Sequence, residues 1–315
     1  MRVLVTGGAG FIGSNLVHAL IGGGHAVGII DDMSKGKPEN LHPHAWFRTL
    51  DILDPEMPAA VAEFAPDAVV HLAAQASVGE SLRDPERDRA VNAEGTLAVA
   101  RAARAAGATR VISASSAAVY GEPDPALLPL AEGAPKSPAN PYGASKLAAE
   151  GLLAEELLGS GVDFASFRFS NVYGPRQDAA GEGGVIALYC AALHAGQPPV
   201  VFGTGEQTRD FIYVGDVVGA IVAALFAESP LGTGVGDAGA YNISTGRETS
   251  VNDVLRSLRE ASGYWGAADM RPAREGDVDR SSLRAGKAEG RFGWTARQDL
   301  DSGLAMTWRW FAART

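Results

Sequence analysis

Short apolar runs alternate with helical patterns through the first 170 residues of the chain. The runs are short stretches rich in apolar residues, and small or polar residues follow them. They lie at 2–6, 26–30, 47–50, 68–74, 109–113 and 164–169. Apolar positions at helical spacing fill intervals at 55–65, 84–107 and 140–160. This order predicts a doubly wound α/β sheet of parallel strands, flanked by helices.

The first strand runs directly into a glycine-rich turn, Thr6-Gly-Gly-Ala-Gly-Phe-Ile-Gly13, in which a helical pattern begins. A strand, a glycine turn and a helix in this order start a Rossmann unit, which binds the pyrophosphate of a dinucleotide. Gly7 and Gly8 allow the tight turn, Gly10 lets the backbone approach the pyrophosphate, and Gly13 lets the helix lie close to the strand. The helix N-terminus then offers free N–H groups to the phosphates.

The second strand ends in two acidic residues, Asp31 and Asp32. Asp31 lies 18 residues after Gly13, near the spacing at which a carboxylate binds the adenosine ribose hydroxyls. Because a carboxylate there repels a 2′-phosphate, the sequence favours NAD over NADP, although Lys35 and Lys37 follow closely. The alternative role for Asp31 is to cap a turn or a helix.

Composition narrows the class of protein further. The net charge of −10 argues against nucleic acid as a partner. Cys190 is the only cysteine and the six histidines are scattered, so we expect no disulfide framework and no metal site; His71 reads as a core histidine. No apolar run is long enough to cross a bilayer, and the chain enters a strand without a signal peptide, so we expect a cytoplasmic protein with no membrane contact.

Beyond residue 170 the periodicity loosens. Helices are expected at 185–195, 214–227, 251–261 and 299–313, and short strands at 198–203 and 210–213, while 229–240 reads as a loop. We therefore expect residues 1–170 to form the dinucleotide-binding Rossmann domain. Residues 171–315 are expected to form mainly a smaller substrate-binding lobe over the open edge of the sheet, with some segments that return to the first domain.

Tyr142 and Lys146 carry the candidate chemistry. They are four residues apart at the start of a helix and therefore face the same side. A lysine ammonium and the positive nicotinamide ring of an oxidised cofactor both favour the tyrosine phenolate. Ser116 ends a neighbouring strand and can hydrogen-bond a substrate oxygen. Such a trio can take a proton from an alcohol while a hydride leaves its carbon.

With these residues in place, the sequence resembles an extended short-chain dehydrogenase/reductase of the UDP-galactose (UDP-glucose) 4-epimerase family. The likeness extends over nearly the whole chain. It rests on these segments: Thr6–Gly13, His71–Ala74, Val78–Ser81, Ser115–Gly121, Tyr142–Lys146, Asn171–Arg176, Thr208–Tyr213 and Arg274–Asp277.

The resemblance implies that Ser116, Tyr142 and Lys146 are catalytic, and that Arg209 and Arg274 clamp a UDP diphosphate, unless they form ordinary surface ion pairs. The expected NAD contacts are Gly7, Gly10, Phe11, Ile12, Gly13, Asp31, Asp32, Ser34, Asp51, Ile52, Leu72, Ala73, Ala74, Gln75, Asn92, Tyr142, Lys146 and Ser170. The expected UDP-sugar contacts are Ser77, Ser116, Asn171, Val185, Val200, Phe202, Arg209, Arg274, Asp277 and Ser281.

Two features narrow the reaction. Relatives that dehydrate or decarboxylate nucleotide sugars carry an acid where this chain has Ala117-Ala118, so a UDP-hexose 4-epimerase is expected. The alternatives are a UDP-glucuronate 4-epimerase, for which Arg176 is the nearest cation by motif, a nucleotide-sugar 4-ketoreductase, and a non-catalytic dinucleotide sensor. Ser281 stands where some relatives carry a bulky tyrosine, which implies room for an N-acetyl group.

A homodimer is also expected. The helices at 84–107 and after Tyr142 are rich in alanine and leucine on more than one face, and such helices pair across a two-fold axis in this family. The alternative is that both helices are buried within one subunit.

Overall fold

The computed structural model describes residues 1–179, 184–273 and 278–314. At its centre is a seven-stranded sheet with the order β11-β6-β5-β4-β1-β2-β3, in which every neighbouring pair is parallel. The strands are β1 (Arg2–Thr6), β2 (Ala26–Asp31), β3 (Trp46–Thr49), β4 (Ala68–His71), β5 (Arg110–Ser116), β6 (Asp163–Phe169) and β11 (Ala240–Ile243). The predicted doubly wound sheet is confirmed, because strands 3-2-1-4-5-6 have the Rossmann order.

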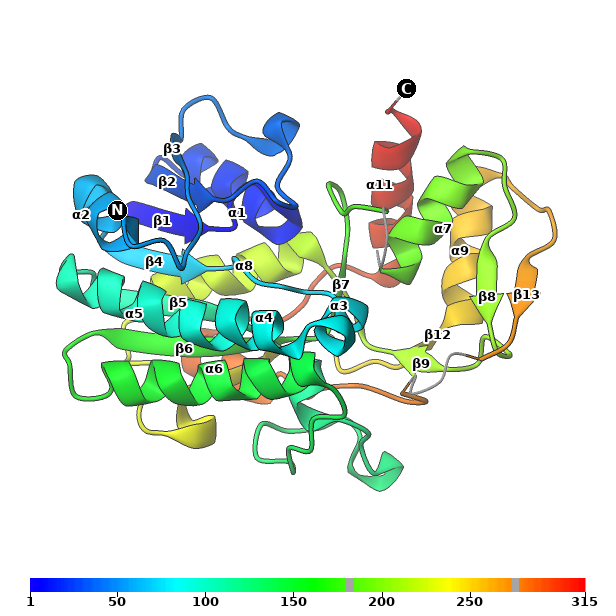
Figure 1. The fold of residues 1–315 in the computed structure, drawn as a ribbon. Helices are drawn as coiled ribbons and strands as arrows, with labels where there is room; N and C mark the ends of the chain where they lie inside the picture. Colours follow the sequence, from blue (N-terminus) through cyan, green and yellow to red (C-terminus); the bar gives the residue numbers. More distant parts are fainter. Residues whose placement is uncertain (180–183, 274–277, 315) are drawn as a thin grey trace.

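Helices cover both faces of this sheet (Figure 1). The helices around the sheet are α1 (Phe11–Gly22), α2 (Met57–Phe64), α3 (Val78–Arg83), α4 (Pro85–Arg89), α5 (Gly95–Ala105), α6 (Pro141–Leu157), α8 (Val214–Leu225) and α10 (Gly286–Phe292). Strand side chains alternate between the two layers: Val3 and Val5 of β1 pack with α1 and α8, whereas Leu4 packs with α2, α5 and α6. The sheet therefore has an apolar core on each side.

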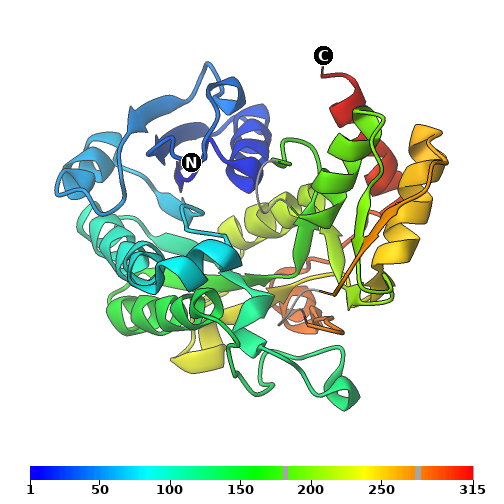
Figure 2. The same ribbon diagram turned by 45° about the vertical axis from the view of Figure 1, so that its right-hand side comes forward.

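A smaller lobe lies beyond the carboxyl ends of the strands, toward which the arrows of β1 and β4 point (Figures 1 and 2). It consists of β7 (Asn171–Tyr173), α7 (Val185–His194), β8 (Val200–Phe202), β9 (Thr208–Arg209), β10 (Phe211–Tyr213), β12 (Thr249–Ser250), α9 (Val251–Ser262), β13 (Asp269–Arg271) and α11 (Leu300–Ala312). Its own core joins α7, α9 and α11 to Val201 and Tyr173. The ligand edge of the sheet thus faces this lobe.

The helix expected at 84–107 is confirmed, because residues 85–105 are helical without a break. The segment is divided into α4, one π-helical turn η2 (Ala90–Glu94) and α5, and α3 ends just before it at Arg83. Asp84 separates this helix from α3, because it ends α3 and its carboxylate caps α4 by accepting the Arg87 N–H at 3.0 Å. The π turn changes the direction of the side chains that follow it, and such turns are frequent at functional sites.

The sheet also holds a strand that the sequence pattern did not predict. β11 pairs with β6 in the register Tyr241↔Phe167, and α8 packs against α1. Both segments come from the second half of the chain. The division of the chain at residue 170 remains a prediction.

Candidate active site

The turn after β1 is tight, and two of its glycines are required by its geometry. Gly7 has φ of +70°, and a Cβ on Gly13 would lie 2.1 Å from the Gly7 carbonyl oxygen. A side chain on Gly13 would therefore force α1 away from the turn, and one on Gly7 would meet the backbone of Leu72 and Ala73 after β4. Gly10 is the N-cap of α1 and has no side chain. No side chain therefore caps the first N–H groups of the helix, which include those of Phe11 and Ile12. This arrangement suits a bound phosphate.

Asp31 lies at the end of β2 and is buried. One carboxylate oxygen accepts the Ala9 N–H at 2.9 Å and the other accepts the Met33 N–H at 2.9 Å. Burial raises the pKa of Asp31, and these two hydrogen bonds oppose the rise. Asp31 therefore fastens the glycine turn to the loop after β2, while each oxygen keeps a lone pair for a further donor. Asp32, by contrast, is exposed and accepts from the backbone N–H and the hydroxyl of Ser34 in its own turn.

The segment after β4 is held in place by Asn92. The Asn92 carboxamide pairs with both backbone groups of Gln75, accepting from its N–H and donating to its carbonyl at 3.0 Å each. It also donates to Asp88 and to the Ser145 hydroxyl of α6, at 3.1 Å each. Asn92 thus reaches the strand edge, as expected, and acts on the backbone of the predicted NAD contacts. These contacts are Leu72, Ala73, Ala74 and Gln75, all half-buried at the end of β4.

His71 at the end of β4 is a core residue, as expected. Its ring is buried between Thr6, at 2.7 Å, and Thr96, at 3.1 Å. Burial lowers the pKa of His71 to about 3, and the nearby Lys146 adds to the effect. The imidazole is therefore neutral at physiological pH.

Ser116, Tyr142 and Lys146 meet at the carboxyl edge of the sheet. Ser116 ends β5, and its hydroxyl is hydrogen-bonded to the phenol of Tyr142 in the first turn of α6. Burial raises the pKa of Tyr142, and the bond from Ser116 opposes this rise. Lys146 lies one turn further along α6 and donates to the Ala114 carbonyl at 3.1 Å. Ser116 and Tyr142 are therefore in contact, and Lys146 lies one helical turn away on the same helix.

Lys146 is almost completely enclosed. Burial lowers its pKa to about 8, while the carboxylates of Asp88 and Glu150 oppose this change. Its ammonium is therefore present at neutral pH and is lost as the pH rises through about 8. A cation in this position favours the phenolate of Tyr142.

Gly143 and Glu150 support this trio and were not singled out from the sequence. A Cβ on Gly143 would lie 2.4 Å from the Ala118 carbonyl oxygen, so only glycine lets α6 approach the turn after β5. The Glu150 carboxylate accepts from the Ser115 hydroxyl at 2.5 Å and is paired with Arg168, at 2.6 Å. The signal for Gly143 was its position between Tyr142 and Lys146 in the first turn of a helix.

The remaining predicted NAD contacts are spread around this edge. Asp51 is exposed and accepts the Leu53 N–H at 2.9 Å, whereas Ile52 is buried in the core with α2. Ser170 is buried and bonds the Asp210 carboxylate at 3.4 Å. Asp210 in turn accepts from the backbone of Thr245 and thereby ties β11 to the lobe.

The predicted substrate contacts lie mainly in the lobe. Asn171 is exposed at the start of β7, whereas Val185, at the start of α7, and Ser281 are half-buried. Arg209, on β9, is half-buried and donates to the Thr208 carbonyl at 2.7 Å. Ser77 is the N-cap of α3 and accepts the Glu80 N–H. Arg274 and Asp277 lie outside the described residues.

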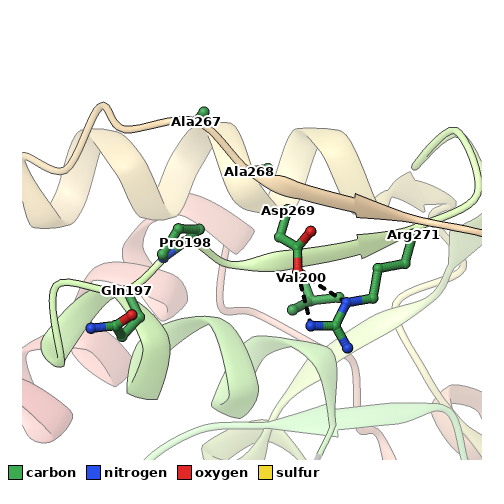
Figure 3. Close-up of a pocket in the computed structure, with 7 residues that line it drawn as sticks. All are labelled: Gln197, Pro198, Val200, Ala267, Ala268, Asp269 and Arg271. Atoms are coloured by element: carbon green, nitrogen blue, oxygen red, sulfur yellow. Dashed lines mark hydrogen bonds and ion pairs between the residues drawn. The ribbon is translucent and has the colours of Figure 1, made fainter.

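Val200 and Phe202 lie on β8, whose parallel partner is β13. Val200 lines an open hollow of about 470 Å³ beside this pair of strands (Figure 3). Asp269 and Arg271, two residues apart on β13, form an ion pair at 2.8 Å. The residues that line the hollow are Gln197, Pro198, Val200, Ala267, Ala268, Asp269 and Arg271. The residues Ser116, Tyr142 and Lys146 do not line this hollow.

The described part of the chain contains no helix that is long and apolar enough to span a membrane.

A Rossmann sheet with a serine, a tyrosine and a lysine at its carboxyl edge defines an extended short-chain dehydrogenase/reductase. Residues 3–243 match the model of the NAD dependent epimerase/dehydratase family, and the chain belongs to that family. It is 42% identical over 317 residues to a UDP-glucose 4-epimerase of Mycolicibacterium smegmatis, covering 99% of this chain and 98% of the relative.

Solved structures agree with this assignment. A UDP-glucose 4-epimerase of Thermotoga maritima with UDP-glucose has a TM-score of 0.93 at 38% identity, covering 99% of this chain and 98% of that chain. A UDP-glucose 4-epimerase of Thermus thermophilus in complex with NAD has a TM-score of 0.90 at 37% identity, covering 100% of both chains. The expected family is therefore confirmed.

Proposed function

We propose that the protein is an NAD-dependent 4-epimerase that interconverts UDP-glucose and UDP-galactose through a transient 4-keto sugar. The observation that carries this proposal is that Ser116, hydrogen-bonded to Tyr142, and Lys146, one turn further along α6, come from the carboxyl end of β5 and the start of α6 in a Rossmann sheet. The relatives named UDP-glucose 4-epimerase, which match over nearly the full chain, support the same substrate class.

The residues of the turn fit NAD. The uncapped N-terminus of α1 suits the pyrophosphate, and the Asp31 carboxylate has lone pairs left for the ribose hydroxyls. NAD supplies the hydride acceptor and donor for C4 of the sugar. Asn92 and Gln75 then keep the backbone of 72–75 in a fixed position beside the trio. The residues that we propose to bind NAD are those that the sequence predicts.

Tyr142 takes the proton from the sugar O4 and returns one to it after the 4-keto sugar has turned over. The Ser116 hydroxyl holds both the phenol and the sugar oxygen, and the Lys146 ammonium stabilises the phenolate. Arg209 and Arg274 hold the diphosphate while the sugar turns, and Asn171, Phe202 and the other predicted contacts hold the rest of UDP.

The absence of an acid at Ala117 and Ala118 favours epimerisation over dehydration. Both residues lie in the short helix η3 (Ala117–Tyr120) directly after Ser116. We further propose that the N-acetylated sugar pair is accepted, because Ser281 is small.

A cytoplasmic homodimer is the proposed state of the protein. The helices α5 and α6 lie side by side on the outer face of the sheet (Figure 1). Leu97, Leu147 and Leu152 on these helices are only half-buried in one subunit, which supports a partner surface there.

The test is incubation of the purified protein with UDP-glucose, UDP-N-acetylglucosamine or UDP-glucuronate, without added cofactor, followed by product analysis. We expect the C4 epimer of UDP-glucose to form until equilibrium is reached. Conversion of UDP-glucuronate alone would favour the glucuronate epimerase instead. Reduction of a 4-keto sugar only with added reduced cofactor would favour the ketoreductase.

A further inference from the structure

A buried carboxylate that the proposed mechanism does not use lies next to the trio. Asp88, on α4, is 1% exposed, whereas Glu86, Arg87 and Arg89 of the same helix are exposed. One oxygen, Oδ1, accepts from Gln75 Nε2 at 2.7 Å and from Asn92 Nδ2 at 3.1 Å. These bonds fix the direction of the carboxylate.

The second oxygen, Oδ2, is enclosed and has no hydrogen-bond partner among the residues that the structure describes. An enclosed carboxylate oxygen without a donor is unfavourable for folding, since it loses its water without replacement. A neutral amide at position 88 would still pack there. The stability of the fold therefore does not explain why this position carries a carboxylate.

The charges around Asp88 supply that reason. Helix α4 packs against α6, and the Asp88 carboxylate acts electrostatically on both Lys146 and Tyr142 of that helix. The next carboxylate of α6, Glu150, is already paired with Arg168. The other charged residues on the elements packed against α4 are Glu80 and Arg83 of α3, Glu94 of η2, and Glu155 and Glu156 of α6.

We propose that Asp88 is a positioning residue that holds a negative charge beside the Tyr142–Lys146 pair, and that this charge sets the pH range in which the enzyme works. The proposal rests on the proposed epimerase function.

The direction of the effect follows from simple electrostatics. An anion disfavours the phenolate of Tyr142 and favours the ammonium of Lys146, so it raises the pKa of both groups. The active form needs the phenolate and the ammonium together. Removing the anion should therefore move both limbs of the pH–rate profile in the same direction, toward lower pH.

The experiment is the pH dependence of kcat for the NAD-loaded enzyme and its Asp88→Asn variant. We expect both limbs of the variant to lie at lower pH by about one unit, the size of effect typical of a neighbouring charge in a buried site. Asp84→Asn is the matched control, because it makes the same chemical change on an exposed residue beside α4 and keeps the helix cap. Its limbs should coincide with those of the wild type.

A fall in kcat or in thermal stability with both limbs unmoved would overturn the proposal, since that is the pattern of a merely structural residue. Limbs that move in opposite directions would also overturn it. Asp88→Glu, which keeps the charge, should restore the wild-type positions. If Asp88→Asn does not fold, Asp88→Ser removes the charge and keeps an oxygen acceptor for Gln75.

A second readout separates this proposal from the proposed function. The phenolate of Tyr142 can be titrated by ultraviolet absorbance in the NAD-loaded protein, as the difference from a Tyr142→Phe partner of each variant. In Asp88→Asn this titration should occur at lower pH than in Asp84→Asn. An unchanged midpoint would refute the role of Asp88, whereas a wild type without epimerase activity would refute only the proposed function.

Discussion

The Ser116 hydroxyl is hydrogen-bonded to the phenol of Tyr142, joining the end of β5 to the first turn of α6. Burial raises the pKa of Tyr142, and this bond is what opposes the rise. Ser116→Ala should therefore raise that pKa further and move the acid limb of the pH–rate profile to higher pH. The check is kcat against pH for both proteins. An acid limb at or below the wild-type position would contradict this account of Ser116.

Tyr142→Phe should lower kcat by roughly 10²–10⁴-fold, the usual contribution of a positioned acid–base group. The phenylalanine keeps the ring and loses only the proton carrier. Tyr264→Phe, after α9 in the smaller lobe, is the matched control and should keep its activity. Turnover of UDP-glucose by both variants is the measurement. Near-normal turnover by Tyr142→Phe would remove Tyr142 from the mechanism.

Gly143→Ala should separate the trio without touching its side chains. The new Cβ would lie 2.4 Å from the Ala118 carbonyl oxygen, so α6 must move away from η3, at a cost of about 1–3 kcal/mol. Gly151→Ala is the control on the same helix, where a Cβ meets nothing within 4 Å. It should keep full activity and raise the free energy of unfolding by about 0.5–1 kcal/mol. Equal activity and stability of the two variants would show that α6 does not approach η3 closely at Gly143.

Asp31→Ala should weaken NAD binding and relax the discrimination against NADP, because the repulsion of a 2′-phosphate is lost. The structure adds a second effect: the Ala9 and Met33 amides lose their acceptor, so the thermal midpoint should fall as well. Both cofactors are titrated into the apoprotein of each form. If the wild type binds NADP as well as NAD, the interpretation of Asp31 fails.

Ser281→Tyr should close the sugar site to an N-acetyl group, since a phenol ring and an acetamido group cannot share one space. Ser281 is half-buried, whereas its neighbour Ser282 is 1% exposed, so the first of the two has room for a longer side chain. The ratio of activities on UDP-N-acetylglucosamine and UDP-glucose is measured for both proteins. A ratio unchanged in the variant, or no activity of the wild type on the N-acetylated sugar, would contradict the prediction.

The Rossmann half could be predicted because its strands are continuous apolar runs that end in recognisable turns. β11 could not, since its four residues, Ala240–Ile243, follow an aperiodic loop and are specified by a partner strand distant in sequence. The π turn at Ala90–Glu94 likewise leaves the apolar spacing of a long helix almost unchanged.

The trio and the glycine turn could be predicted because their residue types occur at a spacing that their chemical roles require. The burial of Asp88 could not be predicted, because an acidic residue among Glu86, Arg87 and Arg89 is typical of a solvent-exposed helix face. Only the fold shows that this one carboxylate turns inward toward α6.

The late position of β11 in the chain has a consequence during synthesis on the ribosome. When residues 1–170 have emerged, β6 has a partner on one side only, and its other edge stays open until residue 243 follows. An open edge of this kind can pair with a second nascent chain, so this half is most prone to aggregation before translation is complete. The last strand to join the sheet thus closes the edge that the first half leaves exposed, and a shortened chain that ends before β11 would lack this protection.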